Sequence, residues 1–217
     1  MNLKKYELNK KDLIKNCFDI MQQVTNKQFV TLRGFDEIPN QVSVNNDIDV
    51  MVCGSHVIPF LDQSFKNLGF TLYVDNHNYM YGAEPHYQFV NNKLDVKFDI
   101  VTGLYYRSIN DKMLWIPINK EVQKSMIANK INVEEIYKIQ PSPEDELIHI
   151  VCHCIFDKRK TTQKYIDRIN YLLTIINEDK IKYLMERAFY ASWTSVYDKL
   201  KKDPSNLYEE YIQYTNY

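Results

Sequence analysis

The spacing of apolar residues changes from helical to alternating and then back to helical along this chain. Between Leu8 and Gln23 apolar side chains recur every three or four residues, which is typical of an amphipathic helix. Alternating apolar runs then predict strands over 29–32, 47–52, 70–74, 86–90, 94–101, 104–107 and 113–118, with one helix over 55–67 between them. Beyond residue 119 the alternation stops, and helices are predicted over 143–156, 162–176, 180–202 and 207–214.

Local signals sharpen two of these elements. The short polar connection at 91–93 predicts a hairpin between its flanking strands. Ser142, Pro143 and the acids that follow are typical of a helix start, because Ser caps free N–H groups and acids favour the positive end of the helix. We therefore predict an α+β domain over residues 1–120, with a mixed sheet and flanking helices, followed by a helical domain over 121–217.

Composition narrows the functional classes. The 217 residues carry 27 basic and 28 acidic side chains, so a formal net charge of −1 offers no broad attraction for nucleic acid or an anionic membrane. No apolar run is long enough to span a bilayer, and the N-terminus lacks the apolar stretch of a signal peptide. The four cysteines do not form a disulfide-type pattern, so the expected location is the cytoplasm.

The strongest chemical signal is the pair Asp47 and Asp49. On a strand both carboxylates share one face, while the apolar residues between and after them point into a core. Like charges this close repel each other unless a cation lies between them, and hard oxygen ligands suit Mg²⁺ (or Mn²⁺). Further along, Asp95, Lys97 and Asp99 share a face of another predicted strand. The alternatives are a simple turn capped by polar side chains at Asp47 and a surface charge ladder around Lys97.

Gly34 after the first strand, followed by Asp47-x-Asp49 at the next, resembles the nucleotidyltransferase superfamily that shares the polymerase-beta palm. The segments 32–35 and 46–49 are similar to uncharacterised members associated with bacterial polysaccharide gene clusters, and the similarity extends over roughly residues 29–170. The resemblance implies a nucleotidyltransferase-like mixed sheet, two Mg²⁺ ions and a nucleoside triphosphate (NTP) as substrate. The acceptor would be a small hydroxyl- or phosphate-bearing molecule or a glycan precursor.

The same resemblance assigns roles to individual residues. The metal ligands and catalytic acids would be Asp47, Asp49 and a third acid from the later strand. Asp95 fits the family's hDhxh pattern at 94–98 best, and Asp99 is the alternative. Residues expected to contact the nucleotide are Arg33, Gly34, Lys97 and His153.

One departure from the family pattern opens alternatives. Many catalytic members place Ser directly after the turn glycine, where its hydroxyl helps to hold phosphate, whereas this chain has Phe35. A non-catalytic relative that binds a ligand or a partner protein, and a phosphotransferase that decorates glycans, therefore remain alternatives to nucleotidyl transfer.

Other residue groups are less specific. His149, Cys152 and His153 share a helix face, but no fourth ligand accompanies them, so a zinc site is not favoured. The basic run at 157–160 suits a helix C-terminus and alternatively a phosphate contact. Aromatic residues of the last predicted strand pair either pack against the protein or stack on a base or sugar.

Overall fold

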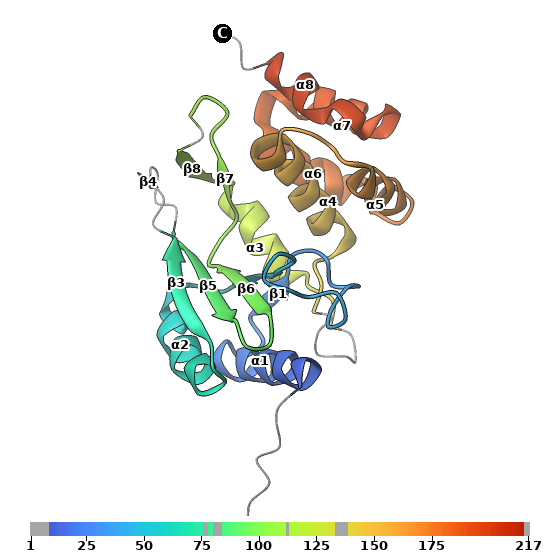
Figure 1. Ribbon diagram of the computed structural model, residues 1–217. Coiled ribbons are helices and arrows are strands. Elements are labelled where there is room, and N and C mark those ends of the chain that lie inside the picture. The colour runs from blue at the N-terminus through green and yellow to red at the C-terminus, as the bar shows by residue number, and fades with distance from the viewer. Residues whose placement is uncertain (1–8, 76–77, 80–83, 112, 133–138, 215–217) are drawn as a thin grey trace, which may run out of the picture. The chain divides into compact units, whose positions relative to one another are not determined.

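The computed structural model describes residues 9–75, 78–79, 84–111, 113–132 and 139–214 (Figure 1). The chain forms two compact units. Unit 1 comprises Met1–Asn76, Pro85–Thr102 and Asn132–Gln140, and unit 2 comprises His77–Glu84, Gly103–Ile131 and Pro141–Tyr217. The boundary expected near residue 120 therefore falls inside unit 2, and the chain passes between the units several times instead of once.

Unit 1 is built on a five-stranded mixed sheet with the spatial order β1-β2-β6-β5-β3. Its strands are β1 (Phe29–Thr31), β2 (Ile48–Val52), β3 (Thr71–Asp75), β5 (His86–Asn91) and β6 (Val96–Val101). β2 and β6 run parallel, whereas every other neighbouring pair is antiparallel. The α+β class, the mixed sheet and the hairpin formed by β5 and β6 are thus confirmed.

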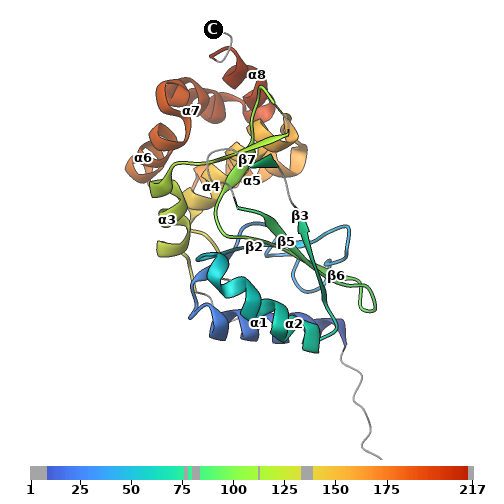
Figure 2. The same cartoon turned by 90° about the vertical axis from the view of Figure 1, so that its left-hand side faces the viewer.

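Two helices, α1 (Lys10–Val24) and α2 (Ile58–Asn67), cover one face of this sheet (Figure 1, Figure 2). The side chain of Asn9 accepts a hydrogen bond from the backbone N–H of Asp12, which caps the first turn of α1. A short 3-10 turn, η1 (Ser55–Val57), leads into α2. The helix predicted from residue 55 therefore begins as a tighter turn before it becomes regular.

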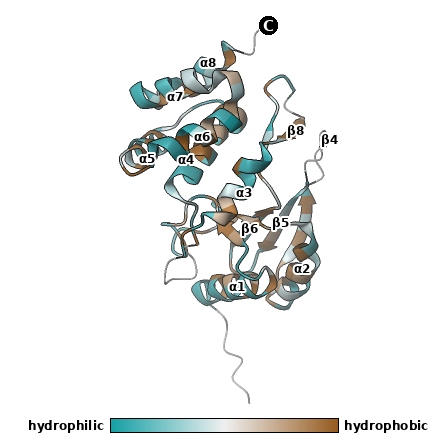
Figure 3. Cartoon of the chain, turned by 180° about the vertical axis from the view of Figure 1, so that it is seen from behind, coloured by the Kyte–Doolittle hydropathy of each residue, from teal (hydrophilic) through white to brown (hydrophobic). Residues whose placement is uncertain are grey.

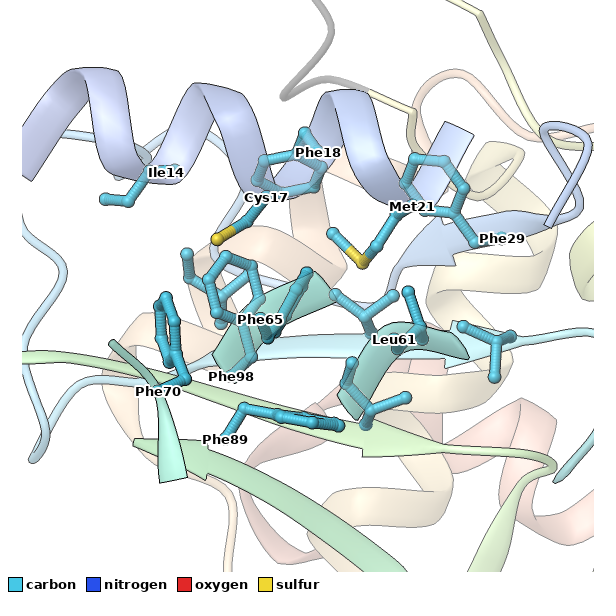
Figure 4. Close-up of a cluster of buried hydrophobic side chains, with 14 of the residues drawn as sticks. Ile14, Cys17, Phe18, Met21, Phe29, Leu61, Phe65, Phe70, Phe89 and Phe98 are labelled. Carbon is cyan, nitrogen blue, oxygen red and sulfur yellow. The ribbon is translucent and has the colours of Figure 1, made fainter. Parts of the chain in front are cut away.

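The core of unit 1 fills the space between these helices and the sheet. Figure 4 shows aromatic and aliphatic side chains from both helices and from the strands gathered there. The ring of Phe65 lies 5.0 Å from that of Phe89 and 5.7 Å from that of Phe98, measured between centroids. The strands β5 and β6 are coloured largely hydrophobic in Figure 3. Because strand residues alternate, burial of Phe98 directs its neighbours Lys97 and Asp99 to the other face of the sheet.

Unit 2 combines a small sheet with a group of helices. The sheet order is β4-β8-β7, and its strands are β4 (Asn78–Tyr79), β7 (Tyr105–Arg107) and β8 (Leu114–Pro117). The helices are α3 (Lys120–Ala128), α4 (Pro143–Cys152), α5 (Gln163–Leu173), α6 (Glu178–Phe189), α7 (Trp193–Lys202) and α8 (Leu207–Ile212). Shorter helical turns are η3 (His153–Lys158, a π-helix), η4 (Tyr190–Ser192) and η5 (Pro204–Asn206). β7 and β8 form the predicted second strand pair.

Two helical features of unit 2 differ from the prediction. Helix α3 was not predicted, although the side chain of Asn119 caps its start. The helix expected over 180–202 is divided, because α6 ends at Phe189 and Tyr190 has a backbone φ of 47° that no right-handed helix contains.

Helix α4 is the most buried helix of unit 2, with every residue from Glu144 to Cys152 buried. The hydroxyl of Ser142 accepts a hydrogen bond from the backbone N–H of Asp145, so the predicted cap is confirmed. In the part of the chain that the structure describes, no helix is long and apolar enough to cross a bilayer.

Candidate metal centre

The acids of the second strand lie on the sheet face that is turned away from α1 and α2. Ile48 and Val50 are buried in the core, and alternation therefore directs Asp49 to the opposite face. β6 runs parallel to β2 with Asp99 directly opposite Asp49. Neighbouring strands are only about 4.8 Å apart, so this register brings the two carboxylates together.

Asp47, which immediately precedes β2, completes a group that we call the acid cluster: Asp47, Asp49 and Asp99. One carboxylate oxygen from each residue lies within 4.8 Å of the other two. All three side chains are partly buried. Burial raises the pKa of Asp49; the guanidinium of Arg33 lowers it, and the charges of Asp47 and Asp99 raise it again, so the net pKa is raised. The cluster thus holds negative charge in a place that disfavours it.

Two basic side chains contact the acid cluster from the same sheet face. Nε of Arg33 donates a hydrogen bond of 2.6 Å to Oδ2 of Asp49, and Nζ of Lys97 lies 2.8 Å from Oδ2 of Asp47. Burial lowers the pKa of Lys97, but its contact with Asp47 and the charges of the other two acids outweigh burial and raise it. Arg33 and Lys97, which were expected to contact the nucleotide, form ion pairs with Asp49 and Asp47.

Asp99 is the least compensated of the three acids. Its Oδ1 atom is buried and has no hydrogen-bond partner among the described residues, and Nδ1 of His86 lies 3.7 Å from it. An octahedral Mg²⁺ ion has bonds of about 2.1 Å, which puts opposite oxygen ligands about 4.2 Å apart. Small side-chain rotations would bring the three oxygens within that span, so the all-oxygen donor set fits Mg²⁺ or Mn²⁺.

Asp95 lies apart from the acid cluster, which corrects the choice made from the family pattern. It occupies the turn before β6 with a φ of 52°, so strand alternation does not apply to it. Its Oδ1 accepts a hydrogen bond of 2.9 Å from the backbone N–H of Val44. Its Oδ2 lies 3.7 Å from Nζ of Lys10, and the side chain is 61% exposed. The alternative residue, Asp99, is the one that joins Asp47 and Asp49.

The loop between β1 and β2 begins with the expected glycine turn. Gly34 has a φ of 66°, and a Cβ added there would meet no atom within 4 Å. Gly34 is therefore required for its backbone conformation, and the space beside it is open. Phe35 is only 3% exposed, so this departure from the family pattern is a packed apolar residue. No hydroxyl is available at that position to hold a phosphate.

His153 belongs to unit 2 and does not form part of the acid cluster as the structure describes each unit. Its Nδ1 lies 3.0 Å from Oδ2 of Asp157, and its ring stacks near that of His149. Nδ1 of His149 in turn pairs with the hydroxyl of Tyr106 at 2.8 Å. Burial raises the pKa of the Cys152 thiol, which disfavours the thiolate that zinc needs. Among the described residues, the acid cluster is the one group with metal-binding spacing.

Sequence reasoning missed His86 as a neighbour of the acid cluster. His86 begins β5, one strand beyond Asp99 in the sheet. The β5–β6 hairpin was predicted, but its register pairs Gln88 with Asp99 and puts His86 two residues further along. Deriving the register of the β5–β6 hairpin from its turn could have indicated that His86 lies near Asp99.

No protein-family model matches this chain, and no curated protein is similar enough to be matched to it. The function must therefore be argued from the geometry of the acid cluster and from the residues around it.

Proposed function

We propose that this protein is a Mg²⁺-dependent nucleotidyltransferase with a nucleotidyltransferase-like fold in unit 1. The observation that carries the proposal is that three carboxylates converge within 4.8 Å of one another. Asp47 directly precedes β2, Asp49 lies in β2 and Asp99 lies in β6. The raised pKa of Asp49 supports it, because a divalent cation would stabilise a carboxylate that burial, together with the charges of Asp47 and Asp99, disfavours. Mn²⁺ would fit the same oxygen ligands.

The side chains of the acid cluster would hold the metal, and the residues around them would bind the triphosphate. A bound ion would neutralise charge on the triphosphate and lower the pKa of the attacking hydroxyl. Arg33 carries a planar fork of donors that suits phosphate, and it already lies beside Asp49. The open space at Gly34 allows a phosphate to approach the backbone. Catalysis would then depend on positioning and charge compensation.

The acceptor in this proposal is a small molecule with a hydroxyl or phosphate group, such as a glycan precursor. The net charge of −1 supports a small acceptor, because polynucleotide-binding surfaces need an excess of basic residues. The protein would act in the cytoplasm, where NTPs and Mg²⁺ are abundant.

The decisive experiment compares two acids of the same strand region, Asp99 and Asp95. Calorimetry measures the binding of each NTP with and without Mg²⁺, and a coupled assay measures pyrophosphate release in the presence of candidate acceptors. Asp99→Asn should remove metal-dependent NTP binding and reduce turnover by at least about a hundredfold, as losses of charge stabilisation do. Asp95→Asn is the matched control and should behave like the unaltered protein, because Asp95 lies in an exposed turn.

The proposal would be contradicted if the two substitutions had equal effects, or if the affinity for NTP were the same with and without Mg²⁺. Transfer without pyrophosphate release would indicate a phosphotransferase instead.

A non-catalytic role is the second candidate, and a specific observation favours it. Arg33 and Lys97 already pair with two of the acids, and a buried Phe35 stands where a phosphate-binding Ser would be expected. In that case ion pairs would replace the metal, and the face would bind a ligand or partner protein without chemistry. The calorimetric experiment distinguishes the two, since only the enzyme needs Mg²⁺ to bind an NTP.

A further inference from the structure

Unit 2 contains a cavity of about 320 Å³ that is separate in sequence from the acid cluster. Its lining comes from the β7–β8 hairpin, η3, the end of α6 with η4, and α8. Four aromatic side chains take part: Tyr106, Phe156, Tyr190 and Tyr211. A volume near 300 Å³ with mostly apolar walls and a few polar groups is typical of a site for a small ligand.

Arg107 is the one charged side chain among the described residues that line this cavity. Its guanidinium lies 5.3 Å from the ring centroid of Trp115, and no carboxylate of the described residues forms an ion pair with it. The nearby acid Asp157 accepts a hydrogen bond from the backbone N–H of Arg107, and its other carboxylate oxygen lies 3.0 Å from Nδ1 of His153. The lining thus contains one basic residue and, among the described residues, no acidic one, which favours an anionic ligand.

The rim of the cavity is held in place before any ligand arrives. The guanidinium of Arg159 donates hydrogen bonds of 3.0 Å and 3.1 Å to the carbonyls of Ser108 and Ile109. The backbone N–H of Ser108 also donates a bond of 2.8 Å to the carbonyl of Leu114 across the hairpin. A fixed rim lowers the entropic cost of binding a small molecule.

Tyr190 lines the cavity and has an unfavourable backbone conformation. Its φ of 47° and ψ of −125° suit glycine, yet the residue carries a large ring that is 66% exposed. Neither packing nor backbone preference explains an exposed aromatic residue here. Strained residues of this kind cluster at ligand sites, where the side chain serves binding.

We propose that this cavity binds a phosphorylated ring compound, either a sugar phosphate or a nucleoside monophosphate. The phosphate pairs with Arg107, whose fork of donors matches it. The flat face of the ring packs against Tyr190 and Tyr211. The amides of Asn110 and Asn119, which also line the cavity, are available to hydroxyl groups of the ligand.

The test is a ligand-observed NMR titration of the full chain in EDTA. EDTA removes the divalent metal that the proposed transferase needs, so binding that Arg107→Ala weakens in EDTA is independent of the proposed transferase activity. Glucose 1-phosphate and UMP are compared with glucose and uridine, which lack the phosphate. At least one phosphorylated compound should bind saturably and at least about tenfold more tightly than its uncharged partner. Comparison of the affinities for glucose 1-phosphate and UMP shows whether the site prefers a sugar or a nucleoside.

Variants then locate the site. Arg107→Ala should weaken binding by about tenfold or more, whereas Arg187→Ala should not change it. Arg187 is a matched control, because its guanidinium also lies over a tyrosine ring, 3.3 Å from the centroid of Tyr183. Tyr190→Gly should weaken binding while the melting temperature stays equal or rises, since glycine adopts the backbone conformation without strain.

The proposal is overturned if neither phosphorylated compound binds. It is overturned equally if the phosphorylated and uncharged partners bind with the same affinity, or if binding survives Arg107→Ala unchanged. A purely structural role for Tyr190 would show itself as a lower melting temperature in Tyr190→Gly with unaltered affinity.

Discussion

Each unit of this protein gathers acidic side chains, and their surroundings differ. In unit 2 two acids at the start of α4, Glu144 and Glu146, meet matched donors. Glu144 accepts a bond of 2.7 Å from the backbone N–H of Asn177 and lies 2.9 Å from Nζ of Lys180. Glu146 receives two bonds from Arg168, at 2.6 Å and 2.8 Å. The helix dipole adds to this stabilisation, because the acids lie at its positive end.

The acid cluster of unit 1 is matched only in part, because Arg33 and Lys97 pair with Asp49 and Asp47 while Oδ1 of Asp99 is buried without a hydrogen bond among the described residues. Burial tends to raise the pKa of Glu144, but its hydrogen bonds and Lys180 outweigh burial and lower it. The pKa of Asp49 is raised instead, despite its contact with Arg33. Ionisation of the carboxyl group therefore favours the folded state at Glu144 and opposes it at Asp49. Such a costly arrangement is typical of functional sites, and the proposed metal ion would relieve the cost.

The largest expected effect comes from breaking the matched group. Arg168→Ala would remove both guanidinium hydrogen bonds from Glu146, whose side chain is 6% exposed. The free energy of unfolding should fall by about 3 kcal/mol, as measured by urea denaturation. Lys66→Ala is the control, since its pair with Asp62 lies on the surface and should contribute less than about 1 kcal/mol. Similar losses for both variants would remove the distinction between the two units.

The second prediction concerns a variant in which the acid cluster loses one of its basic partners. Lys97→Gln removes the partner of Asp47, so the free energy of unfolding in EDTA should fall by about 1–2 kcal/mol. Adding Mg²⁺ should raise the melting temperature of this variant more than that of the unaltered protein, because the ion replaces the lost cation. The matched control is Lys10→Gln, which removes a partner of Asp95 outside the cluster. A variant that Mg²⁺ does not stabilise would argue against a metal site.

The third prediction uses pH to compare Asp49 with Glu144. The folded-state pKa of Asp49 is raised, so its contribution to stability falls as pH rises from its ordinary value of 3.8 through the folded pKa. In EDTA, the free energy of unfolding of Asp49→Asn should therefore increase relative to that of the unaltered protein as pH rises over that interval. The increase should be about 1.4 kcal/mol for each pH unit between the two pKa values. The measurement is the free energy of unfolding against pH.

Glu144 should give the opposite sign in the same experiment. Its folded pKa is lowered, so its contribution is present above its ordinary value of 4.5 and is lost as pH falls through the folded pKa. Glu144→Gln should be less stable than the unaltered protein near neutral pH and should approach it in acid. If the free energies of unfolding of Asp49→Asn and Glu144→Gln changed with pH in the same direction relative to the unaltered protein, the proposed difference between the two acids would be wrong.

The smallest expected effect concerns the turn that precedes the acid cluster. Gly34→Ala meets no steric obstacle, so its cost is that of a positive φ alone, roughly 1–2 kcal/mol. Gly34→Asn should cost less, because asparagine tolerates this conformation. Thermal unfolding measures both. A much larger loss in either variant would indicate a close contact that the open space beside Gly34 does not suggest.

Much of the fold follows from local patterns, and the departures have local causes of their own. The spacing of apolar residues predicts α1, α4 and the β5–β6 hairpin, since these elements depend on neighbours in sequence. The break between α6 and α7 carries no Gly or Pro signal, because the residue in the left-handed conformation is Tyr190. The division into units also escapes sequence reasoning, since the chain returns to unit 1 at Asn132–Gln140. Such a return depends on contacts between distant segments.

The sequence by itself determined that Asp49 lies on the polar face of a buried strand, with Asp47 two residues before it, because alternation is a property of the strand alone. Only the tertiary structure decided which later acid joins them. The parallel register of β2 and β6 puts Asp99 opposite Asp49, and a left-handed turn removes Asp95 from the strand. Register between strands that are distant in sequence is set by hydrogen bonds and core packing across the whole sheet, and these leave no local signal.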